Sequence, residues 1–163
     1  LLAAEYPDDT RSLSLYGWPN VGDAFMKSIA TAGPREFPAD GTTVREHWVR
    51  RWGMSGMGLD NPSDSRFSEA LGVRTLVALL QAGRNWFWAY RAIGESDHRA
   101  LAKRVTCPVL LFAGPRDHLW HETQDAVADF SSAHFVAMDW VGVDAADEEP
   151  DAFCNIVDRF IRR

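Results

Sequence analysis

The chain has 163 residues, of which 46% are hydrophobic and 25% are charged, so it is long enough for one domain with its own core. Its net charge of −6, with no basic stripe carrying aromatic residues, argues against a nucleic-acid partner. No apolar run approaches the roughly 18 residues of a membrane span, so we expect no membrane partner either. Cys107 and Cys154 cannot form a disulfide framework. We expect both to be small buried hydrophobes in a reducing compartment, the cytoplasm.

The first residues predict a helix end followed by a strand. The chain opens with LLAAEYPDD, without an initiating Met or a signal peptide. Residues 1–5 are typical of the last turns of a helix, which Pro7 ends. We therefore expect the chain to be a piece of a longer protein. Polar and apolar residues then alternate over 10–17, which predicts a strand.

The middle of the chain predicts helices joined by loops. A short helix is expected in 21–33, and the capping-box spacing of Thr43 and Glu46 predicts a helix over 43–52. A loop follows, and then a long helix from about 65 or 72 to 93, with apolar residues at near-helical spacing.

The last third predicts a parallel α/β layer. The apolar run CPVLLFAG, 107–114, is bounded by Pro and Gly, as in a strand buried on both faces. A helix over 122–130 and a second strand over 133–139 follow. The final helix is expected to begin at Pro150. Strand, helix, strand and helix at this spacing indicate βαβ connections.

The segments CPVLLFAGPRD and EEPDAF, the latter followed by RFI, resemble the C-terminal part of the α/β-hydrolases. The resemblance covers both ends of the chain, and the middle by position and helicity. It implies an α/β fold in which parallel strands are flanked by helices, with an inserted helical cap. Residues 1–19 would be the core strand segment after the nucleophile helix, 20–103 the cap, and 104–163 the C-terminal core segment.

The resemblance places Asp117, in the loop after the buried strand, at the position of the catalytic acid, which would orient and stabilise an imidazole. Alternatively, Asp117 caps the following helix or pairs with Arg116. A Gly-x-Ser-x-Gly nucleophile motif is absent from the sequence. The nearest stretch, 53–58, has the wrong spacing, so Ser55 is expected to be a loop residue. The resemblance places the nucleophile upstream of Leu1.

The loop after the second predicted strand lacks the family's histidine. Anchored on 149–153 and on the strand at 133–138, the family pattern places Val143 at the histidine position without a gap. Valine cannot transfer a proton. Asp144 is one substitute, since a carboxylate can act as a weak base, although it could not repeat the paired acid and base roles of an imidazole.

A second substitute is His118, which follows Asp117 directly, and His121 is a weaker one. The remaining histidines are expected on the surface or at the wrong end of the sheet: His47, His98 and His134. Asp117, His118 and His121 have no evident fourth ligand and no zinc-like spacing, so we expect no metal. We also expect no cofactor.

Aromatic residues are concentrated in the expected cap, and one helix cannot bury the run WFWAY on a single face. They either pack the cap against the core or line a cavity for an apolar small molecule. The candidate substrate-binding residues are Trp48, Trp52, Trp86, Trp88, Trp120 and Val143.

Three functions remain open at this point. The resemblance implies a protein that acts on a small apolar ester, lactone or related substrate under an aromatic-lined lid. The valine at the histidine position favours instead a non-catalytic ligand-binding or interaction protein. A third option is a cofactor-free enzyme of the same fold with another reaction. In each case we expect the sheet edge to need the missing N-terminal half or a second copy of the chain.

Overall fold

The computed structural model describes residues 2–19, 22–54 and 69–163, and for residues 23–24 and 50–54 it describes the backbone alone. The chain divides into two compact units, one formed by 1–21 with 97–163 and the other by 22–96. Helix α6 (His98–Lys103) groups with the first unit, which contains the sheet.

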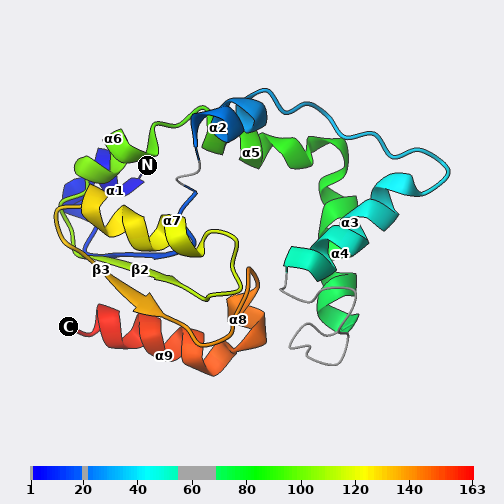
Figure 1. Cartoon of the computed structure of the whole chain (residues 1–163). Coiled ribbons are helices and arrows are strands. Elements are labelled where there is room, and N and C mark those ends of the chain that lie inside the picture. Colours follow the sequence, from blue (N-terminus) through cyan, green and yellow to red (C-terminus); the bar gives the residue numbers. More distant parts are fainter. Residues whose placement is uncertain (1, 20–21, 55–68) are drawn as a thin grey trace. The chain divides into compact units, whose positions relative to one another are not determined.

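Three parallel strands form the sheet in the order β1-β2-β3: β1 (Leu13–Tyr16), β2 (Val109–Ala113) and β3 (Ala133–Ala137) (Figure 1). Val109 is in register with Leu13 on one side and with Ala133 on the other. All five residues of the central strand β2 are buried. The prediction of a parallel sheet with a fully buried strand is thus confirmed, since a strand between two neighbours and two helical layers has no solvated face.

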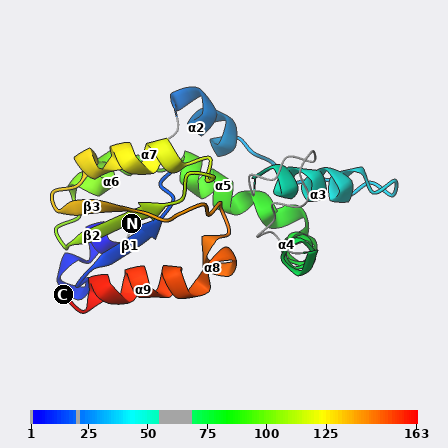
Figure 2. The same ribbon diagram turned by 60° about the horizontal axis from the view of Figure 1, so that its bottom comes forward.

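Helices cover both faces of the sheet (Figure 2). Successive residues of a strand point to opposite faces, so β2 contributes side chains to both layers. Leu110 and Phe112 of β2 pack with Phe160 of α9 (Pro150–Ile161). Val109 and Leu111 pack on the other face with residues of three short elements, α1 (Leu2–Glu5), α6 and η3 (Ala126–Asp129). Helix α7 (Trp120–Asp125) lies on the same face, where Trp120 packs against Phe135 of β3. Helix α9 begins at Pro150 as predicted.

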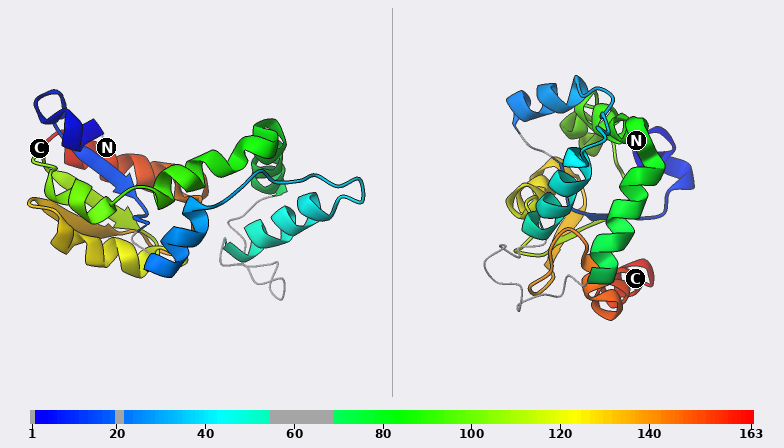
Figure 3. Two further views of the ribbon diagram at one scale, coloured as in Figure 1. Left: turned by 90° about the horizontal axis from the view of Figure 1, so that it is seen from above. Right: turned by 90° about the vertical axis from the view of Figure 1, so that its right-hand side faces the viewer.

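The second unit consists of helices: α2 (Asp23–Ala30), α3 (Thr42–Met54), α4 (Glu69–Ala82), η2 (Gly83–Trp86) and α5 (Phe87–Gly94). Helix α2 packs against α5, and α3 lies alongside α4 (Figure 3). At Gly94, an added Cβ would lie 2.4 Å from the Ala30 nitrogen, so glycine permits this close approach of α2 and α5.

Several sequence predictions are wrong in detail. The single long helix ending at 93 is interrupted at Gly83, whose φ of +56° lies in the left-handed region. The predicted capping box of Thr43 and Glu46 is not what begins α3, because the helix begins at Thr42 and the Thr43 hydroxyl donates to the Glu36 carbonyl (2.7 Å). Asp40 accepts from the Thr42 N–H at the start of α3 (2.9 Å). Cys154 is exposed, whereas Cys107 is buried as expected.

The turn before α9 contains a further short helix, α8 (Ala145–Glu148), that the sequence pattern did not indicate. The prediction for Ser55 lies outside the described residues. No described helix is both long enough and apolar enough to cross a membrane.

Candidate functional site

The carboxyl ends of the three parallel strands bring three loops together at one edge of the sheet, the edge at which open α/β sheets bind ligands. Backbone hydrogen bonds join these loops to β2 and to one another. The Gly17 N–H donates to the Phe112 carbonyl (3.2 Å), and the Arg116 N–H donates to the Val141 carbonyl (3.3 Å). The Met138 N–H donates to the Ala113 carbonyl (2.8 Å). We call this edge the carboxyl edge.

The loops after β2 and β3 approach too closely for any side chain at Gly114. An added Cβ there would lie 2.2 Å from the Val141 carbonyl oxygen, well inside van der Waals contact. Val141 itself is fully buried. Glycine at this position therefore lets the loop after β3 lie directly against the loop that carries Asp117.

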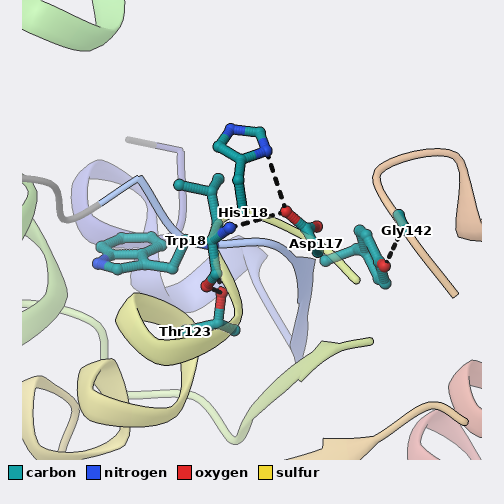
Figure 4. A network of polar contacts seen from close by, with 7 residues as sticks. Trp18, Asp117, His118, Thr123 and Gly142 are labelled. Carbon is teal, nitrogen blue, oxygen red and sulfur yellow. Dashed lines mark hydrogen bonds and ion pairs between the residues drawn. The ribbon is translucent and has the colours of Figure 1, made fainter. Parts of the chain in front are cut away.

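Asp117 lies buried in the loop after β2, with a side chain only 3% exposed. Its Oδ1 accepts a hydrogen bond from the Leu119 N–H (2.8 Å) and lies 3.4 Å from Nδ1 of His118 (Figure 4). Its Oδ2 lies next to Gly17, where an added Cβ would be 3.5 Å away. Asp117 thus both caps the turn that leads into α7 and faces an imidazole.

The surroundings of Asp117 favour its protonated form more than water does. Burial raises the pKa of the carboxyl above its ordinary value, and the nearby carboxylates of Glu122 and Asp144 raise it further. The Leu119 N–H and His118 oppose this shift, because both stabilise the carboxylate. A positively charged group beside the carboxylate would oppose this shift.

Tyr16, the last residue of β1, reaches across to the loop after β3. Its hydroxyl donates to the Gly142 carbonyl (2.5 Å; Figure 4). The Gly142 N–H donates to Oε2 of Glu148 (3.0 Å). Burial raises the pKa of Tyr16, and the charge of Asp117 adds to the effect, so the phenol stays protonated. Because the carbonyl and the N–H of Gly142 are both hydrogen-bonded, the following Val143 is fixed at the carboxyl edge.

Thr123 of α7 joins the loop after β1 to the loop that carries Asp117. Its Oγ1 accepts from the Trp18 N–H (2.8 Å) and donates to the Leu119 carbonyl (2.6 Å) (Figure 4). No sequence motif indicated the roles of Tyr16, Trp18 or Thr123. Their one available signal was the position of Tyr16 and Trp18 at the predicted carboxyl end of a strand.

The predicted site residues fall into two groups. Asp117, His118, Val143 and Asp144 all lie on loops of the carboxyl edge, and His118 is 56% exposed at its side chain. The Trp120 ring packs edge-on against Phe135 of β3, with centroids 5.2 Å apart, and thus contacts the face of the sheet.

The other predicted tryptophans belong to the unit 22–96. Trp86 lies under the Arg35 guanidinium (4.2 Å to the ring centroid) and beside Tyr90. Trp48 is half-buried and Trp88 is 58% exposed. The Trp52 side chain lies outside the described residues.

His121, the weaker candidate base, is exposed on α7. His134 lies in β3 with its ring 5.4 Å from that of Phe160, at the end of the sheet away from the carboxyl edge, as predicted. Within the described ranges, no group of three or more His, Cys, Asp or Glu side chains is arranged to hold a metal ion.

The chain is similar in structure to several solved proteins. One is the enol-lactonase from Burkholderia xenovorans LB400, at 18% identity and a TM-score of 0.66, covering 99% of this chain and 60% of that chain. An esterase from Thermogutta terrifontis is 17% identical with a TM-score of 0.67, covering 98% of this chain and 58% of the esterase. A bromoperoxidase from Bacillus anthracis is 12% identical with a TM-score of 0.70, covering 98% and 63%.

No protein-family model matches the chain, and no curated protein matches it. Similarity at these levels of identity concerns the fold. The chain spans about 60% of the length of the solved structures that it resembles. With its three parallel strands, its flanking helices and the residues gathered at their carboxyl edge, the chain has a partial α/β-hydrolase fold.

Proposed function

We propose that the protein acts on a small apolar ester or lactone and that this chain supplies the catalytic acid. The observation that carries the proposal is the placement of Asp117: a buried carboxylate at the carboxyl edge, 3.4 Å from an imidazole nitrogen. The structural resemblance to an enol-lactonase and to an esterase is consistent with this chemistry.

In this proposal Asp117 orients the His118 imidazole and stabilises its charged form. His118 accepts the proton of the nucleophile and later returns it to the leaving group. Its exposed side chain leaves room for the ring to turn towards a substrate. The nucleophile comes from a part of the protein outside this chain. Asp144, half-buried beside Val143, is the alternative base.

We also propose that exposed tryptophans of the unit 22–96 bind an apolar group. Trp88 exposes 58% of its surface, an unusual state for so large an apolar ring. W88A should raise KM and leave kcat nearly unchanged, because a ring that contacts ground state and transition state equally affects binding alone. Equal losses of kcat and kcat/KM would contradict this role.

The second candidate function is ligand binding without catalysis. One observation favours it: Val143, held at the carboxyl edge through the fixed Gly142 peptide, is apolar where a base is needed. In that case the site keeps a buried acid and an apolar neighbour for ligand recognition alone.

A panel of p-nitrophenyl esters of increasing acyl length distinguishes the two candidates, measured with the intact protein. If His118 is the base, H118A should lower kcat/KM by about a hundredfold or more, while H121A, an exposed neighbour on α7, should change it little. Undiminished turnover in H118A would refute the role of His118. No turnover, with a melting temperature raised by an apolar ligand, would support the binding function.

A further inference from the structure

A cavity of about 430 Å³ lies at the amino ends of the three strands, at the edge of the sheet opposite to Asp117. Its walls come from the segments that precede each strand, including Arg11, Pro108 and Ser132, and from the last turn of α9. The volume falls within the range of small-molecule sites. We call it the amino-edge cavity.

The polar groups of this cavity carry an excess of positive charge. They are Arg11, Ser12, Ser131, Ser132, His134 and Arg163, and no lining residue is Asp or Glu. In the described part of the chain, neither Arg11 nor Arg163 forms an ion pair. The whole chain has a net charge of −6, so this local excess runs against the overall charge. It favours an anionic ligand.

The remaining wall is apolar and partly aromatic. Phe130 and Phe160 are each 8% exposed, and Pro108, Ala133 and Ile161 are the other apolar residues of the lining. The His134 ring lies 5.4 Å from the Phe160 ring. A wall of this kind suits a flat or short apolar group, which a fully hydrated inorganic anion does not offer.

We propose that the amino-edge cavity binds a small carboxylate that carries an apolar ring or short chain. The planar guanidinium of Arg11 matches a carboxylate through two parallel hydrogen bonds, with Arg163 adding charge. The hydroxyls of Ser12 and Ser132 can donate to the same oxygens, whereas the Ser131 hydroxyl donates to the Val105 carbonyl (3.1 Å). The apolar body lies against the aromatic wall. This site depends on neither Asp117 nor His118.

The test is a titration of the intact, isotopically labelled protein followed by NMR, with benzoate, its neutral analogue benzamide, and inorganic phosphate as probes. Benzoate should give saturable shifts at the amides of Ser131, Ser132 and His134, and benzamide should bind several-fold more weakly. Phosphate should bind more weakly than benzoate. R11Q should weaken benzoate binding about threefold or more. R45Q, an exposed arginine of α3, should leave it unchanged.

The proposal is overturned if benzoate gives no saturable shifts, or if its shifts are confined to Asp117 and Leu119 at the opposite edge. Equal affinity for benzoate and benzamide would remove the role of charge. Equal affinity for benzoate and phosphate would remove the role of the apolar wall. Because the comparison of the three probes uses the unaltered protein, it stands even if R11Q proves unstable.

Discussion

Replacing Gly114 by alanine should separate the two loops that form the carboxyl edge. The new Cβ would lie 2.2 Å from the Val141 carbonyl oxygen and 2.4 Å from its Cγ2. Ordinary contact begins at 3.4 Å, so one of the loops must move by more than 1 Å. Neither loop can move freely, because Val141 is fully buried and its carbonyl accepts the Arg116 N–H.

The cost follows from these contacts. Overpacking a tightly packed site destabilises a protein by about 1–3 kcal/mol. Loss of the hydrogen bond between Arg116 and Val141 adds about 1 kcal/mol. For a chain of this length each kcal/mol lowers Tm by about 2–4 °C, so G114A should melt about 5–15 °C below the wild type.

Thermal unfolding followed by circular dichroism measures the difference, with G33A as the matched control. Nothing lies within 4 Å of a Cβ at Gly33, and its φ is outside the left-handed region. G33A should therefore melt at the wild-type temperature or slightly above it, because alanine restricts the unfolded chain. If G114A also melts with the wild type, the close approach of the two loops is refuted.

D117N should be more stable than the wild type at about pH 7. A carboxyl whose pKa is raised in the folded state stabilises the fold at low pH, and this contribution is lost as pH rises through the folded pKa. The stability advantage of D117N should therefore vanish near about pH 4. An equal stability difference between D117N and the wild type at both pH values would contradict this. Y16F should lose about 1 kcal/mol in chemical denaturation, because the Gly142 carbonyl loses its donor, and wild-type stability would argue against that bond. V143H should raise esterase activity of the intact protein if a base is missing at this position, whereas no gain would count against that reading. The chain should self-associate through the edge of β1 that none of the described strands covers, and a monodisperse monomer in sedimentation velocity would oppose this.

The elements that the sequence predicted correctly are those set by local pattern. The apolar run that contains β2 has no polar alternation, and only a strand covered on both faces accommodates it. Pro150 lacks the N–H that the first residue of a helix does not use, so it indicates the start of α9. The parallel order then follows from the connections of strand, helix and strand.

The errors arose where a local pattern admits two structures. Gly83 sits within a near-helical apolar pattern that continues on both sides, and glycine in such a pattern either is tolerated or ends the helix. Its positive φ shows the second outcome. Cys154 lies on α9 next to the apolar stripe, and its one-residue offset from Phe153 turns it towards solvent.

The candidate site was predictable in position but not in its contacts. Asp117 follows a buried strand, so its place at the carboxyl edge follows from topology. The hydrogen bond between Tyr16 and Gly142 joins residues 126 positions apart in the sequence, and no local pattern encodes it. The same holds for the bond between Trp18 and Thr123, which are 105 positions apart.

The charges at the two edges of the sheet bear on which ligand each edge can bind. At the carboxyl edge, Asp117 is surrounded by the carboxylates of Glu122 and Asp144, which raise its pKa. Under the proposed function these carboxylates disfavour a negatively charged substrate, which is consistent with a neutral ester or lactone. A carboxylate, such as the product of hydrolysis under the proposed function, would find complementary charge at the opposite edge, beside Arg11 and Arg163.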